Sequence, residues 1–179
     1  MDLQRLGVKL FVTDPGAIRV KDFVPVFHSW IQRQCVEGHL LIDVHDYSHI
    51  QNGPGILLVS HEANFCTDMA EGKLGLAYYR KQPAGANLES HLDAALKAAR
   101  QAASLLEKEP AFEGRLRFRK DELLVIPNDR LLAPNDGATF ATLQPSLENV
   151  FGKDAKLTHA STNPKDRLTV RVQVPVRYP

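Results

Sequence analysis

A short polar segment carries most of the side chains that could do chemistry. From His45 to Glu62 the chain reads HDYSHIQNGPGILLVSHE, which places three histidines, an aspartate and a glutamate within eighteen residues. Histidine and carboxylate side chains are zinc ligands and also general acids and bases. The segment therefore admits three interpretations: a metal site, a catalytic His–carboxylate pair, or a hairpin whose polar residues cap turns and face water.

The spacing does not favour a metal site. His45 and His49 form H-x3-H, which binds zinc when both lie one turn apart on a helix, but the Gly53–Gly55 turn that follows disfavours a helix here. His61-Glu62 does not continue into H-E-x-x-H, because no second histidine follows. In a hairpin, His61 would lie roughly 15–20 Å along its strand from the turn. We therefore expect no metal and no cofactor, and we favour the capping interpretation.

The catalytic interpretation uses the same residues. His49, His61 and Glu62 are the candidate catalytic residues, because a histidine beside a carboxylate titrates near neutral pH and can transfer protons. A covalent mechanism would also need a nucleophile, and the nearby hydroxyl and thiol groups belong to Ser48, Ser60 and Cys66. None of these three residues lies in a G-x-S-x-G pattern.

A second polar loop, Pro127–Gly137, offers candidate ligand-binding residues. Asn128, Asp129 and Arg130 lie in it, and with His45 they could hold a small anion, since arginine binds a carboxylate or phosphate through two parallel hydrogen bonds. The alternative is a loop that bonds to its own backbone. This loop and the loop that holds His49 would share a pocket if both lay at the same end of the strands. The competing expectation is that they lie at opposite ends, because neighbouring antiparallel strands run in opposite directions.

Composition limits the class of protein. The 179 residues are 44% apolar and 24% charged, which is typical of one globular domain over residues 1–179. The net charge of +1 predicts no nucleic-acid partner, and the arginines between residues 115 and 119 have no interleaved aromatic side chains for base stacking. No signal peptide or membrane-spanning run is present, so we expect a cytoplasmic protein without a membrane partner. Cys35 and Cys66 are too few for a disulfide framework, and we favour reduced thiols over a bridge.

The hydrophobic periodicity predicts alternating groups of strands and helices. Short turns join most consecutive strands, which favours antiparallel pairing. The sequence therefore predicts an α+β fold: a mainly antiparallel sheet, with mixed pairing left open, and about three helices layered on one face. Trp30 is the expected core anchor of the first helix. The helices are expected at Phe23–Cys35, Leu88–Lys108 and Ala138–Phe151; the strands include 8–13, 40–45, 56–65, 74–81 and a hairpin of 115–119 with 122–126.

Two functional hypotheses follow. The first is a non-catalytic binding or interaction module that self-associates through a sheet edge or a helix face, as a homo-oligomer. The second is a small enzyme whose His–carboxylate pocket, with or without a metal, acts on a small anionic substrate. No motif in the chain meets the geometric demands of a known mechanism, which favours the first hypothesis.

Overall fold

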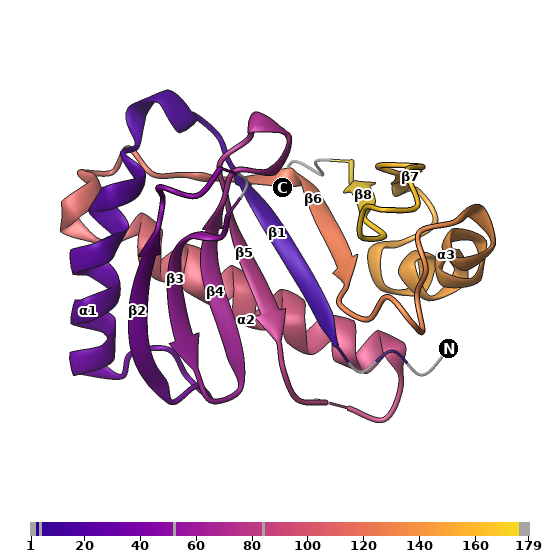
Figure 1. Cartoon of the computed structure of the whole chain (residues 1–179), viewed down its shortest axis with the longest axis horizontal. Coiled ribbons are helices and arrows are strands. Elements are labelled where there is room, and N and C mark those ends of the chain that lie inside the picture. Colours follow the sequence, from indigo (N-terminus) through magenta and orange to yellow (C-terminus); the bar gives the residue numbers. More distant parts are fainter. Residues whose placement is uncertain (1–2, 4, 52, 84, 176–179) are drawn as a thin grey trace.

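One antiparallel sheet organises the protein (Figure 1). The computed structural model describes residues 3, 5–51, 53–83 and 85–175. The sheet has the strand order β2-β3-β4-β5-β1-β6-β8-β7, and each neighbouring pair is antiparallel. In chain order the main elements are β1 (Leu6–Val12), α1 (Phe23–Arg33), β2 (Leu41–Tyr47), β3 (Gly55–Ser60), β4 (Ala63–Asp68), β5 (Gly75–Arg80), α2 (Leu88–Glu107), β6 (Phe118–Pro127), α3 (Gly137–Phe151), β7 (Lys156–His159) and β8 (Val170–Gln173).

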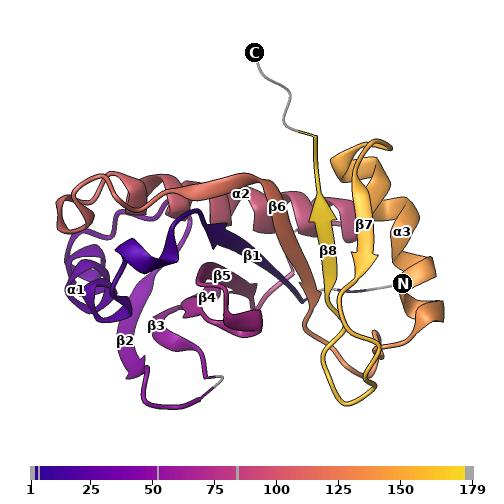
Figure 2. The same cartoon turned by 90° about the horizontal axis from the view of Figure 1, so that it is seen from above.

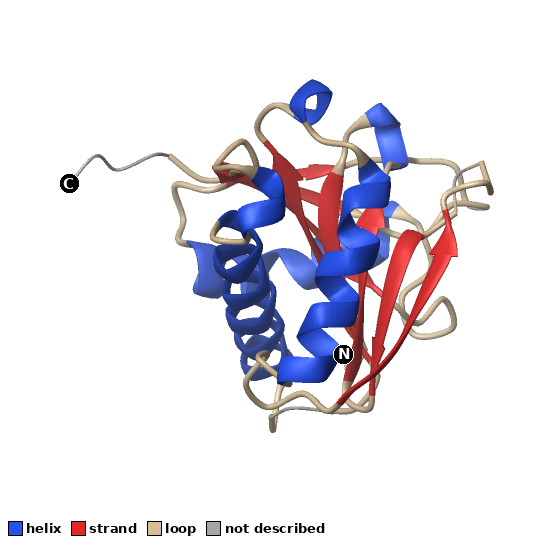
Figure 3. Ribbon diagram, turned by 90° about the vertical axis from the view of Figure 1, so that its left-hand side faces the viewer, coloured by secondary structure: helices blue, strands red, loops and turns tan. Residues whose placement is uncertain are grey.

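The three α-helices lie on one side of this sheet (Figures 2 and 3). Helix α1 packs against β2 and β3, α2 crosses β1 and β5, and α3 contacts α2 and β7. We call the opposite side, which carries no α-helix, the open face. The predicted fold class is confirmed: the fold is α+β, with three helices layered on an antiparallel sheet. No helix in the described part of the chain is long and apolar enough to cross a membrane.

The hydrophobic core lies between the sheet and the helices. Strand β1 is buried along its whole length, and its side chains alternate between the two faces. Leu6, Val8 and Leu10 join the helix-side core, whereas Phe11 belongs to a smaller apolar cluster on the other face. Trp30 is wholly buried, as predicted, and its indole Nε1 donates a hydrogen bond to Glu109 Oε1 at 2.7 Å.

Side-chain caps fix where two of the helices begin. The Asn87 side chain accepts a hydrogen bond from Ser90 N, and the Ser90 hydroxyl accepts one from Asn87 N, so α2 begins with a reciprocal capping box. The Asp136 carboxylate accepts a hydrogen bond from Thr139 N at 2.7 Å at the start of α3. These bonds satisfy amide groups that have no partner within the helix.

Two strand predictions are wrong. The segment 56–65 is not one strand, because the Ser60 hydroxyl donates to Ala63 O at 2.8 Å and accepts from Ala63 N at 3.0 Å, closing a tight turn. The segment 115–126 is not a hairpin. Strand β6 runs on through Lys120 and Asp121, and the register with β1 passes from Leu10↔Leu123 to Val12↔Phe118. This register leaves residues 119–122 of β6 opposite one residue of β1, so the predicted turn is an irregular bulge with several extra residues.

Candidate functional site

The three histidines of the quoted segment do not converge. In the β2–β3 hairpin, Tyr47 pairs with Gly55 and Leu41 pairs with Ser60. His49 therefore lies in the turn at one end of the hairpin, and His61 lies beyond the other end, where its amide donates to Leu40 O at 2.9 Å. Among the described residues, no group of three or more His, Cys, Asp or Glu side chains could hold a metal ion.

The contacts of these residues are local. His45 lies on β2, with Nε2 3.4 Å from Asp43 Oδ2, and the side chains of His45 and Asp43 are 43% and 56% exposed. His61 Nδ1 lies 3.4 Å from Glu62 Oε1, and the Glu62 carboxylate also accepts a hydrogen bond from Leu40 N at 2.9 Å. Burial acts to raise the pKa of Glu62, but these hydrogen bonds outweigh it and the pKa falls below its ordinary value. The catalytic role of His49, His61 and Glu62 stays a prediction.

The second predicted group lies at another edge of the sheet. The last residue of β6 pairs with Leu6, the first residue of β1. This end of the strands is opposite to the end at which the turn with His49 lies. Asp129 Oδ1 accepts hydrogen bonds from the amides of Leu131 and Leu132, so this carboxylate shapes its own loop. Arg130 is exposed. The ligand-binding role of His45, Asp129 and Arg130 also stays a prediction.

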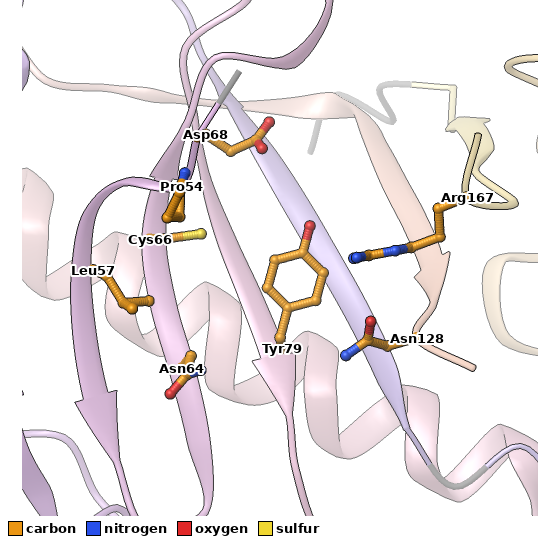
Figure 4. A pocket seen from close by; sticks show the side chains of 9 residues that line it. Pro54, Leu57, Asn64, Cys66, Asp68, Tyr79, Asn128 and Arg167 are labelled. Carbon is orange, nitrogen blue, oxygen red and sulfur yellow. The ribbon is translucent and has the colours of Figure 1, made fainter. Parts of the chain in front are cut away.

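Asn128, by contrast, lies at the wall of a cavity on the open face (Figure 4). This open-face cavity has a volume of about 450 Å³. It is lined by residues of the β2–β3 turn, of β3, β4 and β5, of the loop after β6 and of the segment that precedes β8. Of the seven predicted site residues, all of them described, Asn128 alone belongs to its lining. The lining consists of Gly53, Pro54, Leu57, Asn64, Cys66, Asp68, Tyr79, Asn128 and Arg167.

The Tyr79 ring occupies the middle of the cavity wall (Figure 4). It lies over Gly7 of β1, where a Cβ atom would stand 2.5 Å from the ring, so only glycine leaves room for it. The Arg167 side chain points toward Tyr79, with its guanidinium carbon 5.6 Å from the ring centroid. Burial raises the pKa of the Tyr79 hydroxyl above its ordinary range and raises the pKa of the Cys66 thiol to about 12. Both groups are therefore neutral at physiological pH.

The single carboxylate in this lining is already paired. Asp68 accepts a hydrogen bond from Lys9 Nζ at 2.5 Å, and Lys9 is wholly buried. The same ammonium donates to the backbone oxygens of Ala70 and Lys73 at 3.1 and 2.7 Å. The Lys9 charge thus offsets that of Asp68, which leaves the Arg167 guanidinium as the uncompensated charge of the cavity. Arg167 makes no ion pair with a carboxylate among the described residues.

An adjoining cavity extends the positive region. Its volume is about 270 Å³, and it shares Asn64, Tyr79 and Asn128 with the open-face cavity. It adds three cations to the lining: Arg5, Arg80 and Lys81. The Arg80 guanidinium donates to Gln82 O and to the Tyr78 hydroxyl, and Lys81 Nζ donates to Ser60 O at 2.6 Å, so neither cation is neutralised by these partners.

The segment that carries Arg167 is held by a buried amide. Asn135 Nδ2 donates to Ser161 O at 3.0 Å and to Asn163 O at 2.7 Å, and its Oδ1 lies 2.7 Å from His159 Nε2. The His159 ring is stacked on Phe140 of α3 at a centroid separation of 5.4 Å. Asn135 therefore ties the segment before β8 to the loop after β6.

Sequence reasoning missed most of this site. Asn64, Cys66 and Asp68 share the open face because they alternate along β4, and that spacing was a usable signal. Tyr79 and Arg167 come from distant segments, and only the strand register brings them together. No known family model matches the chain, and no curated protein or solved structure matches it.

Proposed function

We propose that the protein is a binding module whose open-face cavity, with the adjoining one, holds a small molecule that carries a carboxylate or phosphate group. One observation carries this proposal: Arg167 has no described acidic partner, and the cavity's single carboxylate is paired with Lys9. A site with a surplus of cations attracts an anion, and a guanidinium binds carboxylate or phosphate oxygens in pairs.

The remaining lining groups suit the rest of such a molecule. The Tyr79 hydroxyl and the Asn128 amide can donate hydrogen bonds, while Leu57 and Pro54 offer an apolar wall. Asn64 Oδ1 is buried and accepts no hydrogen bond from any described residue, so a hydrogen-bond donor on the bound molecule would satisfy it. Since the nearest thiol and phenol are neutral, the lining favours binding over catalysis, in keeping with the first hypothesis.

Isothermal titration with inorganic phosphate, malonate, citrate and 4-hydroxybenzoate tests the proposal, with 4-hydroxybenzamide as the neutral match for the last. We expect at least one anion to bind and Arg167→Gln to weaken it about tenfold or more. Arg130→Gln is the matched control, because Arg130 is an exposed arginine outside this lining. Equal loss in both variants would transfer the site to the 127–137 loop, and no binding of any anion would refute the proposal.

A second observation favours self-association. Strand β2 is an edge strand of the sheet; Leu40 just before it is 58% exposed, and Ile42 within it is 53% exposed. An exposed strand edge with apolar side chains offers a surface to a second copy of the chain. Light scattering coupled to size exclusion should show a dimer that Ile42→Lys converts to a monomer, whereas a monomeric wild-type chain would refute this.

We also propose a cytoplasmic location, which the two free cysteines support.

A further inference from the structure

A separate cavity lies on the helix-covered face of the sheet, between α2 and the first residues of β6. Its volume is about 400 Å³, and none of its lining belongs to the open-face cavity. We call it the helix-face cavity. The lining consists of Leu10, Arg100, Ala103, Ser104, Glu107, Phe118, Arg119, Lys120 and Leu123.

Two local features create this hollow. The β6 bulge separates Phe118 from Leu123, although both face the helix side, so the strand does not fill the space beneath α2. On the helix, Ala103 faces the sheet with a side chain too short to reach across the gap. The bulge and the alanine together leave a recess where a continuous strand under a leucine would have closed the core.

The recess is apolar inside and positively charged at its rim. Leu10, Ala103, Phe118 and Leu123 form its interior, and all four are buried. At the rim, Arg119 is paired with Asp121 and Glu122.

The other charged rim residues leave a surplus of positive charge. The Glu107 carboxylate accepts a hydrogen bond from Phe118 N at 2.8 Å. Arg100 and Lys120 make no ion pair with any carboxylate in the described part of the chain. Two cations against one carboxylate favour an anionic head group over a cationic one.

We propose that the helix-face cavity binds a carboxylate with an unbranched apolar chain, such as a medium-chain fatty acid. The chain would lie over Leu10 and Phe118, and the carboxylate would meet Arg100 and Lys120 at the rim. A volume of about 400 Å³ is within the range of small-molecule sites. Each methylene that the cavity buries should strengthen binding roughly fourfold, until the cavity is full.

Titration calorimetry with octanoate tests this assignment. We expect octanoate to bind at least tenfold more tightly than butyrate, which has too short a chain, and than octan-1-ol, which has no charge. Ala103→Leu should remove binding because the new side chain fills the recess. Ala94→Leu is the matched control, since it places the same side chain on α2 outside this lining.

A second measurement on the unchanged protein guards against a misfolded variant. Adding octanoate should shift the amide resonances of residues 100–107 and 118–123, which belong to the helix-face cavity. Shifts confined to residues 64–68 and 79, with no loss of affinity in Ala103→Leu, would place the ligand in the open-face cavity and overturn the inference. An octanoate titration with neither heat nor shifts would also overturn it.

Discussion

The ammonium of Lys9 lies 2.5 Å from the Asp68 carboxylate and joins the middle of β1 to the end of β4. The lysine side chain is wholly buried, and its aliphatic stem passes Gly75, where a Cβ atom would stand 2.7 Å from Lys9 Cε. The ammonium is satisfied by three acceptors, which offsets the cost of placing it out of water.

Breaking this pair should be strongly destabilising. Lys9→Met keeps most of the packing but leaves Asp68 without its cation, and removing one partner of a buried pair costs about 3–5 kcal/mol. Urea unfolding of Lys9→Met, Asp68→Asn and the double variant would measure the cost. We expect the double variant to lose less stability than the two single losses added together, because both charges are then removed. A single-variant loss below about 1 kcal/mol would contradict the pairing.

Trp30→Ala should be as damaging for a different reason. The indole is wholly buried against Phe27, and its Nε1 donates a hydrogen bond to Glu109. The substitution therefore opens a large cavity and leaves the Glu109 carboxylate with Arg33 as its remaining partner of these two. Large-to-small core changes of this kind cost about 3–5 kcal/mol. Trp30→Phe should cost clearly less. Because Trp30 is the sole tryptophan, native emission should be blue-shifted and resist iodide; red-shifted, quenchable emission would show the side chain to be exposed.

The two free thiols should react at very different rates. Burial raises the pKa of Cys66 to about 12. Burial also raises the pKa of Cys35, but by less, because this residue is partly exposed. Disulfide reagents attack the thiolate, so Cys66 should react slowly at pH 8, with a rate that rises about tenfold per pH unit. Ellman's reagent should titrate one thiol quickly in native protein and two in urea. Cys66→Ala identifies the slow thiol, and two equally fast thiols would contradict its burial.

Acid should weaken the start of α3. The hydrogen bond from Thr139 N lowers the pKa of Asp136 below its ordinary 3.8. A lowered pKa in the folded state gives stability that is present above the unfolded pKa and lost as pH falls through the folded pKa. Asp136→Asn keeps a capping acceptor that does not titrate. Its melting temperature should match the wild type at pH 7 and fall less below pH 4; parallel curves would refute the cap.

The sequence predicted features that depend on local pattern. The helical span of α2 and the burial of Trp30 were predictable because the spacing of apolar residues along the chain indicates both. The turn at Ser60 was missed because a serine hydroxyl closes it, with no glycine or proline to mark it. The Lys120-Asp121 pair resembled a turn, yet it lies in a bulge, because β6 pairs with β1 on both sides of it, at Phe118 and at Leu123.

The site could not be predicted in the same way. Tyr79 lies on β5 and Arg167 precedes β8, and no local pattern encodes the strand order that places these two segments on one face of the sheet. Asn128 was selected because it lies in a polar loop, and it does line the open-face cavity. The histidines were selected for their chemistry, but the hairpin register separates them. Residue type thus suggested candidates, whereas proximity depended on long-range pairing.

The central position of β1 has a consequence for how the chain is made. A ribosome releases β1 first, but its partner β5 emerges only after α1, β2, β3 and β4, and its partner β6 only after α2. Strands β2 to β5 can form by successive hairpins as they appear, because each pairs with its neighbour in the sequence. Strand β1, buried along its length when folded, must meanwhile wait as an exposed apolar segment. The nascent chain is therefore most prone to aggregate, and most in need of a chaperone, before β6 has left the ribosome.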